Sequence, residues 1–261
     1  MSRLSDFLFY EEPGITLYCG DCRVILPLLR CPNTSYCLEA CDGRCGGAAL
    51  VLTDPPYETE AHTLQRRVKR AGGVMAIEAL PFAQIDAEIR ADFCGALAGL
   101  ARRWVLVFCQ AEAVSAWRTA LEGAGIHYRR PMVWIKPDAM PQYSGDRPSM
   151  GHESIVAAWA GKGKSIWNGG GRAGVFHHPK NDPYFDDGRA AHPTQKPGPL
   201  IRELIELFSS ADNLVLDPFA GSGTTLRAAK DLGRRAIGIE IEPKYCEITV
   251  KRLRQEVLPL A

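Results

Sequence analysis

Four residues with chemical potential follow one another at Asp54, Pro55, Pro56 and Tyr57, directly after the apolar run A-A-L-V-L-T. The prolines fix the backbone φ angle and have no N–H group, so their carbonyl oxygens face no competing donor. A carboxylate accepts hydrogen bonds, and a tyrosine ring offers a flat surface for stacking. The segment therefore places an acceptor, a donor-free carbonyl and an aromatic ring at one strand end. The simpler alternative is a strand-terminating turn with a partly buried tyrosine.

A second pattern lies far along the chain, in N-L-V-L-D-P-F-A-G-S-G-T-T-L-R-A-A at 213–229. It reads as a strand, an acid, a glycine turn and a helix. Gly221 and Gly223 let the backbone approach a ligand closely, and the helix N-terminus behind them favours a negative group. Glu240 ends the next apolar run, 17 residues after Gly223. Nucleotide-binding βαβ units carry a ribose-binding acid at about that distance.

Two common ligand classes are excluded by the residues of this turn. A P-loop needs a lysine after its glycines, and none is present. A dinucleotide fingerprint needs a third glycine or alanine, where this chain has Leu226. A ligand with one ribose and one carboxylate, and without pyrophosphate, fits better. The alternative, a tight turn without a ligand, is disfavoured by Asp217, Thr224, Thr225 and Glu240 around it.

The elements that must position these residues are short apolar runs alternating with helical patterns. Strands are predicted at 15–19, 48–53, 104–109, 128–137, 153–159, 213–217 and 236–240. Continuous apolar strands between helices predict an α/β fold with a doubly wound, mostly parallel sheet. In such a sheet the carboxyl ends of the strands carry the ligands.

Three segments interrupt the alternation, and we expect one domain, residues 1–261, with these segments inserted. Residues 31–47 are rich in cysteine, residues 58–80 carry a basic run, and residues 138–192 are rich in Gly, Pro, Asp and Asn. Loops of this length inside a domain are usually functional or disordered.

Composition sets outer limits on function. The chain has 261 residues, is 46% hydrophobic and carries a formal net charge of +1, so any site for a polyanion must be a local basic patch. No apolar run approaches the roughly 20 residues of a bilayer-spanning helix, and the N-terminus lacks the pattern of a signal peptide. A cytoplasmic protein is expected.

The two motifs together resemble a known family. D-P-P-Y at 54–57 with D-P-F-A-G-S-G-T-T at 217–225 resembles the DNA amino-methyltransferases, which transfer a methyl group from S-adenosylmethionine to adenine N6 or cytosine N4. The motif order, with D-P-P-Y first, resembles their β class. I-T-L-Y-C-G-D-C (15–22), H-P-T-Q-K-P (192–197) and G-I-E-I-E-P-K-Y-C (238–246) extend the resemblance over nearly the whole chain.

The resemblance implies where the cofactor binds. Asp21 would lie near the adenine with Cys22 beside it, Glu240 would bind the ribose, and Thr194 and Lys196 would approach the methionine carboxylate. The full implied set of cofactor-binding residues is Asp21, Cys22, Thr194, Lys196, Asp217, Pro218, Phe219, Gly221, Ser222, Gly223, Thr224, Thr225 and Glu240. Methyl transfer from a sulfonium requires no metal, and none is expected.

The resemblance also implies the chemistry of Asp54–Tyr57. The Asp54 carboxylate and the Pro55 carbonyl would accept the two N–H groups of an aromatic amine, which aims its lone pair at the methyl group. The target base would leave the duplex stack and rest on Tyr57. Asp at position 54 favours adenine N6, because many cytosine members carry Ser there; cytosine N4 stays open. Glu58 stands where many relatives have glycine.

Contacts to double-stranded DNA are expected from two basic segments. Arg66, Arg67, Lys69 and Arg70 would clamp phosphates, and Lys162 and Lys164 belong to the expected recognition segment. A solvated helix face and an ordinary surface loop are the respective alternatives. Cys31, Cys37, Cys41 and Cys45 fit zinc-ligand spacing only loosely, so free or packed thiols are favoured over zinc.

Other substrate classes remain open at this point. Methylation of RNA or of a protein amide would use the same cofactor site, and a non-catalytic DNA-binding protein would keep the fold. The motifs do not reveal the recognition sequence, whether the chain forms a homodimer, or whether a cognate restriction enzyme accompanies it.

Overall fold

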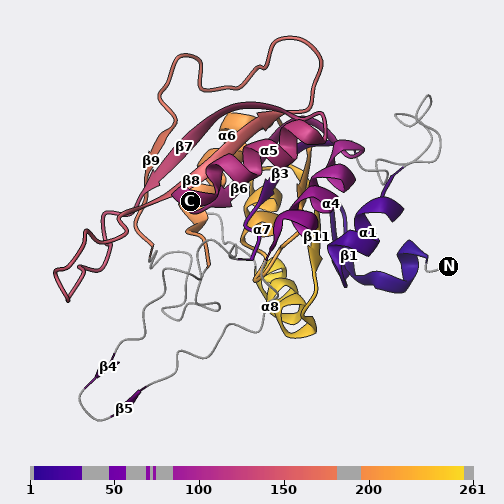
Figure 1. Ribbon diagram of the computed structural model, residues 1–261. Coiled ribbons are helices and arrows are strands. Elements are labelled where there is room, and N and C mark those ends of the chain that lie inside the picture. Colours follow the sequence, from indigo (N-terminus) through magenta and orange to yellow (C-terminus); the bar gives the residue numbers. More distant parts are fainter. Residues whose placement is uncertain are drawn as a thin grey trace, which may run out of the picture.

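A nine-stranded sheet forms the centre of the protein, in the order β1-β2-β11-β10-β3-β6-β8-β7-β9 (Figure 1). The computed structural model describes residues 3–30, 47–56, 69–70, 73–74, 85–180 and 195–255, with the backbone alone at 69–70 and 73–74. The strands of the sheet are β1 (Leu8–Glu12), β2 (Ile15–Cys19), β3 (Ala48–Thr53), β6 (Ala101–Cys109), β7 (His127–Ile135), β8 (His152–Trp159), β9 (Val175–His177), β10 (Leu214–Asp217) and β11 (Arg235–Glu240).

Six α-helices of the described part cover this sheet, three on each face. They are α1 (Cys22–Leu28), α4 (Ala87–Ala98), α5 (Val114–Gly123), α6 (Gly198–Phe208), α7 (Thr224–Asp231) and α8 (Pro243–Arg254). Short 3₁₀ helices lie at Leu4–Phe7 and Ala111–Ala113, and β4 (Lys69–Arg70) and β5 (Gly73–Val74) form a separate antiparallel pair. The described chain contains no helix that is both long and apolar enough to cross a bilayer.

The two faces of the sheet have separate hydrophobic cores, because successive side chains of a strand point to opposite sides. In β3, Leu50 and Leu52 pack with the buried residues of α6, α7 and α8, whereas Val51 packs with those of α1, α4 and α5. All six residues of β3 are buried, as expected for a central strand covered on both faces. The predicted doubly wound α/β fold is confirmed.

The sheet is mostly parallel, but not throughout. Strands β2, β11, β10, β3 and β6 pair in parallel, whereas β8 is antiparallel to both of its neighbours, β6 and β7, and β1 is antiparallel to β2. Strands β1 and β9 were not among the predicted segments. Because β8 is antiparallel to β6 and β7, residues 138–151 and 160–174 of the predicted segment 138–192 lie at opposite ends of the sheet.

The centre of the sheet is a topological switch point. Strand β10 pairs with β3 in parallel, with Val215 opposite Leu50 and Leu216 opposite Val51. The first α-helix described after β3 is α4, on one face of the sheet, and the first after β10 is α7, on the other face. Loops that diverge to opposite faces leave a crevice between them at the carboxyl ends of the strands. Two motifs more than 160 residues apart in sequence thus become neighbours.

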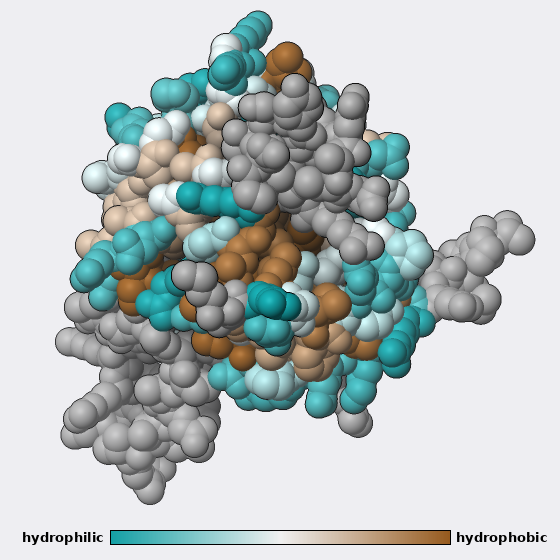
Figure 2. All heavy atoms as spheres, turned by 90° about the vertical axis from the view of Figure 1, so that its right-hand side faces the viewer, coloured by the Kyte–Doolittle hydropathy of each residue, from teal (hydrophilic) through white to brown (hydrophobic). Residues whose placement is uncertain are grey.

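Figure 2 shows the side of the molecule that is on the right in Figure 1. Hydrophilic side chains cover most of what is coloured there, and hydrophobic residues are exposed between them near the centre of the view. The large hydrophobic side chains exposed around β1 and α1 are Leu8, Phe9 and Val24. Isolated exposed hydrophobics of this kind are normal on protein surfaces.

Candidate active site

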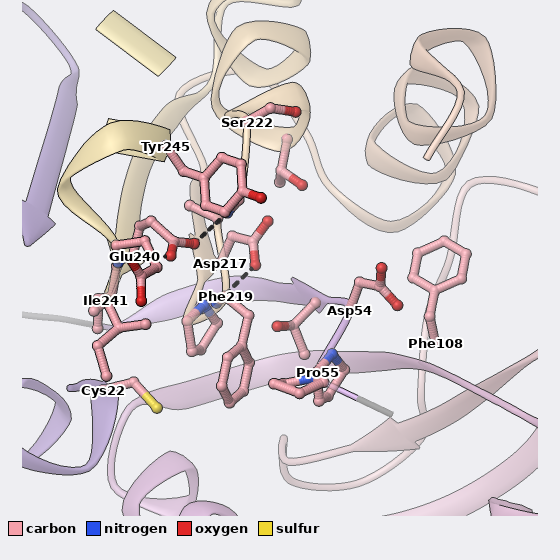
Figure 3. Close-up of a pocket in the computed structure, with 18 of the residues that line it drawn as sticks. Cys22, Asp54, Pro55, Phe108, Asp217, Phe219, Ser222, Glu240, Ile241 and Tyr245 are labelled. Atoms are coloured by element: carbon pink, nitrogen blue, oxygen red, sulfur yellow. Dashed lines mark hydrogen bonds between the residues drawn. The ribbon is translucent and has the colours of Figure 1, made fainter. Parts of the chain in front are cut away.

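A cavity of about 460 Å³ lies at the carboxyl ends of β3, β10 and β11. It gathers most of the residues predicted from the two motifs and from the segments around them (Figure 3). The predicted residues that line it are Asp21, Cys22, Asp54, Pro55, Pro56, Lys196, Asp217, Pro218, Phe219, Gly221, Ser222, Thr224, Thr225 and Glu240. Gly223 does not line it, and Tyr57 and Thr194 lie outside the described residues.

The cavity has two chemically different ends (Figure 3). Glu240, Ile241 and Cys22 lie at one end, and Asp54, Pro55 and Phe108 lie at the other, with Phe219 and Asp217 between them. Asp54 directly follows β3, and Glu240 is the last residue of β11. A ligand that fills this space must therefore be elongated and lie across the switch point.

The glycine turn before α7 has the backbone shape that its sequence predicts. Gly221 and Gly223 have φ angles of +53° and +79°, a region that L-residues with a side chain rarely adopt. A Cβ atom on Gly223 would lie 2.5 Å from Cγ2 of Thr249 in α8, whereas one on Gly221 would meet no atom within 4 Å. Thr249 Oγ1 in turn donates to the Gly221 carbonyl at 3.1 Å. Gly223 is thus required for packing, and Gly221 leaves its side of the turn open to a ligand.

Glu240 is held in place by backbone groups. Its Oε2 accepts the Gly221 N–H at 2.8 Å, and its Oε1 accepts the Glu242 N–H at 2.9 Å. Burial raises the pKa of this carboxyl above its ordinary value, and the two backbone donors oppose that shift. A carboxylate has about four acceptor positions, so Glu240 can accept further hydrogen bonds from a diol.

An arginine from the last helix fixes the glycine turn from behind. Arg252 Nη1 donates to the Ser222 carbonyl at 2.9 Å and to Thr224 Oγ1 at 2.9 Å, and Nη2 donates to Gln195 Oε1 at 2.9 Å. Gln195 also accepts the Ser222 hydroxyl at 3.0 Å. The segment before α6 and the glycine turn are therefore joined, although neither Gln195 nor Arg252 was a predicted site residue.

Asp21 and Cys22 begin α1 at the edge of the cavity. Asp21 caps the helix by accepting the Arg23 N–H at 2.8 Å, and it forms an ion pair with the Arg23 guanidinium at 2.6 Å. The hydrogen bonds from Arg23 lower the pKa of Asp21 against the effect of burial. Burial raises the pKa of the Cys22 thiol to about 12. Cys22 is therefore a packing residue of the cavity wall and not a nucleophile.

Asp217 is the most strongly perturbed carboxyl group of the cavity. It is 4% exposed, and burial raises its pKa to about 7. Hydrogen bonds from Thr225 and from the Phe219 N–H, the latter at 3.2 Å, oppose this shift, and the nearby charge of Asp54 adds to it. A cationic group bound beside Asp217 would favour its ionised form.

Comparison with known proteins agrees with this arrangement. Residues 164–251 match the family described as DNA methylase, of the N6/N4 class. The Type II methyltransferase M.HinfI of Haemophilus influenzae is 34% identical over 145 residues, and M.XycI of Xanthomonas campestris pv. cyanopsidis is 33% identical over 151 residues. These matches cover 48% and 53% of this chain, and 38% and 49% of the relatives. The chain thus spans less than half the length of either relative.

Solved structures share the fold over nearly the whole chain. The M1.HpyAVI–SAM complex has a TM-score of 0.66 at 23% identity and covers 92% of this chain and 100% of that one. The PvuII DNA methyltransferase, named cytosine-N4-specific, has a TM-score of 0.66 at 16% identity, with 94% and 88% covered. Identities this low show the methyltransferase fold alone. The family match over residues 164–251 and the two Type II methyltransferases bear out the resemblance to the DNA amino-methyltransferases.

The methyltransferase motifs did not reveal the apolar walls of the cavity. Phe93 of α4 contributes a ring 5.2 Å from that of Phe219, centroid to centroid. Further wall residues are Ile85, Ile89, Phe108, Ile201, Ile239, Ile241 and Tyr245. Their side chains resemble ordinary core residues in the sequence. Ile239, Ile241 and Tyr245 did carry a signal, since they lie in the segment 238–246 that resembles the ribose-binding strand end.

Of the predicted DNA-contacting residues, only Lys162 and Lys164 have described side chains. Lys162 and Lys164 are exposed and follow β8, whose end at Trp159 pairs with Trp104 near the start of β6. They therefore lie at the end of the sheet opposite the cavity, and their contact with DNA stays a prediction. Lys69 and Arg70 form β4, and Arg66 and Arg67 lie outside the described residues.

The cysteine insertion 31–47 falls outside the description except for Gly47, so the zinc alternative stays open. The described cysteines, Cys19, Cys22, Cys94, Cys109 and Cys246, form no disulfide. No cluster of three potential metal ligands occurs among the described residues.

The contact between Gly223 and Thr249 generates a stability prediction. Gly223→Ala should lower the free energy of unfolding by about 2–4 kcal/mol, from the positive φ angle and the clash together. Gly221→Ala shares the positive φ but has open space, so it should lose only about 1–2 kcal/mol. Urea unfolding of both variants checks this, and equal losses would contradict the role assigned to Thr249.

The raised pKa of Asp217 predicts a pH-dependent stability. Between its ordinary value near 3.8 and about 7, the folded protein holds a proton that the unfolded chain has released. Stability from this group therefore falls as pH rises through that window. Asp217→Asn, which cannot ionise, should be more stable than the unchanged cofactor-free protein at pH 8, by at most about 4 kcal/mol. The difference should shrink toward pH 5.

Urea unfolding at pH 5 and pH 8 measures this difference. The exposed residue Asp92 offers a matched control, and Asp92→Asn should change stability by no more than about 0.5 kcal/mol at either pH. A difference for Asp217→Asn that is the same at both pH values would show that burial does not hold a proton on this carboxyl.

Proposed function

We propose that this protein is an S-adenosylmethionine-dependent DNA methyltransferase that methylates the exocyclic N6 of adenine. The observation that carries the proposal is that Asp54, Pro55 and Pro56 share one cavity with the glycine turn and Glu240. Either motif alone has a simpler explanation as a turn. Both motifs lie at the switch point between β3 and β10. The glycine turn with Glu240 would bind the nucleotide part of the cofactor, and Asp54 with the prolines would bind the amine.

The described residues fit S-adenosylmethionine in charge and shape. Glu240 would hold the ribose hydroxyls, and the turn at Gly221 with the N-terminus of α7 would receive the methionine carboxylate. The adenine would lie between the apolar side chains at the end with Cys22 and Ile241. The cofactor carries a sulfonium and an ammonium group, and the buried Asp217 offers the negative charge that such a cation requires.

The Asp54 end supplies what methylation of an aromatic amine needs. Such an amine is a poor nucleophile because its lone pair is delocalised into the ring. The Asp54 carboxylate and the Pro55 carbonyl can accept its two N–H groups and so favour the pyramidal, attacking geometry. When bound, S-adenosylmethionine supplies an electrophilic methyl group, so that a C–N bond forms as the C–S bond breaks. The nitrogen then releases one proton.

DNA is the proposed substrate because the motif pair is that of DNA amino-methyltransferases and the relatives named above are Type II methyltransferases. A base reaches such a cavity only after it leaves the stack, and Tyr57 would supply the replacement stacking surface. Adenine is favoured over cytosine N4 because position 54 is Asp. RNA and protein amides are the competing substrates.

The first test measures labelled methyl transfer to duplex DNA, RNA and a protein mixture. We expect transfer to duplex DNA alone. Asp54→Ala should reduce kcat by at least about 100-fold, because one fixed acceptor is lost, and should leave the cofactor Kd within about threefold. Asp92→Asn is the matched control, since its carboxylate is exposed on α4. Transfer that persists undiminished in Asp54→Ala would refute the role of this motif.

The second test identifies the base and its sequence context together. A plasmid from cells that express the protein is digested to nucleosides and also sequenced for modified bases. N6-methyladenine within one short recognition sequence is expected. N4-methylcytosine would refute the choice of base while keeping the reaction class.

A further inference from the structure

The structure places Lys196 differently from a cofactor ligand. Its ammonium lies 2.8 Å from Asp54 Oδ2 and 2.7 Å from Glu153 Oε1, and its side chain is only 10% exposed. The Phe108 ring covers it, with the centroid 5.0 Å from Nζ. An ammonium has three N–H donors. Two are directed to carboxylates and the aromatic face lies close by, so Lys196 is committed to the Asp54 end of the cavity.

Glu153 is itself anchored from the far side. Its Oε2 accepts the Lys136 ammonium at 2.8 Å, and Lys136 Nζ lies 4.5 Å from the centroid of the Trp134 ring. Glu153 belongs to β8 and pairs with Trp134 of β7, so this carboxylate is fixed on the sheet. The network runs from the β7–β8 hairpin through Glu153 and Lys196 to Asp54.

The charges in this network balance. Two carboxylates face two ammonium groups, and the four side chains are between 10% and 32% exposed. Burial opposes the charge on Lys196, but Asp54 and Glu153 raise its pKa well above the ordinary value. Burial likewise opposes ionisation of Glu153, but Lys196 and Lys136 lower its pKa. Lys196 and Glu153 are therefore charged at neutral pH, and loss of either one leaves the other poorly compensated.

We propose that Lys196, held by Glu153, is a positioning residue that orients the Asp54 carboxylate toward the substrate amine and does not bind the cofactor carboxylate. This inference rests on the proposed function and assigns a role that the motifs did not reveal. A carboxylate can accept several hydrogen bonds at once, so Asp54 can keep Lys196 while it accepts an N–H of the base. The network supplies the fixed geometry that preorganised catalysis requires.

The same contacts define what Asp54 does with protons. Charged groups near its carboxylate in the described part of the chain include Lys196, Asp217 and, beyond Lys196, Glu153. The Lys196 ammonium favours the ionised form of Asp54, whereas Asp217 opposes it when it is itself ionised. Asp54 therefore acts as a hydrogen-bond acceptor throughout, and the proton released by the methylated nitrogen passes on to water.

The test separates catalysis from cofactor binding. In Lys196→Met we expect kcat for duplex DNA to fall by about 10- to 100-fold, with the S-adenosylmethionine Kd, measured calorimetrically, within about threefold. A lysine that bound the methionine carboxylate would instead weaken Kd by tenfold or more, and that result would overturn the inference. The acidic limb of the kcat–pH profile should also move to higher pH in this variant, because the charge favouring ionised Asp54 is gone.

Two further variants keep the test decisive if Lys196→Met folds poorly. Glu153→Gln keeps the side-chain shape but removes the ion pair that holds Lys196. It should therefore lower kcat, as Lys196→Met does, and leave the S-adenosylmethionine Kd unchanged. Lys196→Arg keeps the charge and should recover part of the lost kcat and the original acidic limb. A loss of thermal stability with no change in kcat in these variants would show a structural role only.

Lys230→Met is the matched control, since Lys230 forms an ion pair of 2.8 Å with Glu12 away from the cavity. It should leave kcat and Kd unchanged. If the unchanged protein binds S-adenosylmethionine but transfers no methyl group to any polymer, the proposed function and this inference both fail. If it transfers normally and Lys196→Met loses only cofactor affinity, the inference alone fails.

Discussion

The parallel pairing of β10 with β3 is the constraint on which the rest of the structure depends. It aligns the carboxyl ends of two strands whose next described α-helices, α4 and α7, cover opposite faces of the sheet. Because the chain diverges there, a crevice is left at one edge of the sheet that no helix can fill. The glycine turn borders the crevice on one side and the Asp54–Pro56 segment on the other. The roles proposed for the glycine turn and for Asp54 both depend on β10 and β3 being neighbours.

The cavity concentrates negative charge, and the protein manages each carboxylate in a different way. Asp21 is paired with Arg23, Glu240 is held by backbone N–H groups, and Asp54 is paired with Lys196. Within the described part of the chain Asp217 forms no salt bridge, and burial raises its pKa to about 7. Asp217, the carboxyl group without a cationic partner among the described residues, thus lies in the middle of the cavity. A positively charged ligand bound there would stabilise its ionised form.

Rigid elements support the reactive end of the cavity. Asp54 follows a fully buried strand, and its lysine partner is anchored through Glu153 to the β7–β8 hairpin. The nucleotide end is fixed by Arg252 and Thr249, both from α8. Residues outside the two motifs therefore fix the positions of both motifs. This division explains why short motifs suffice to identify the site while much of its geometry comes from elsewhere.

The sequence by itself determined the central strands, the glycine turn and the pair of motifs, because apolar runs, prolines and glycines act locally. Gly221 and Gly223 have the positive φ angles that their spacing implies. Only the tertiary structure decided what depends on contacts between distant segments. The ion pair of Lys196 with Asp54, the anchoring by Arg252 and the walls at Phe93 and Phe108 are of this kind. The antiparallel direction of β8, which sends Lys162 and Lys164 to the opposite end of the sheet, was likewise hidden, since strand direction is set by pairing and leaves no mark in a single apolar run.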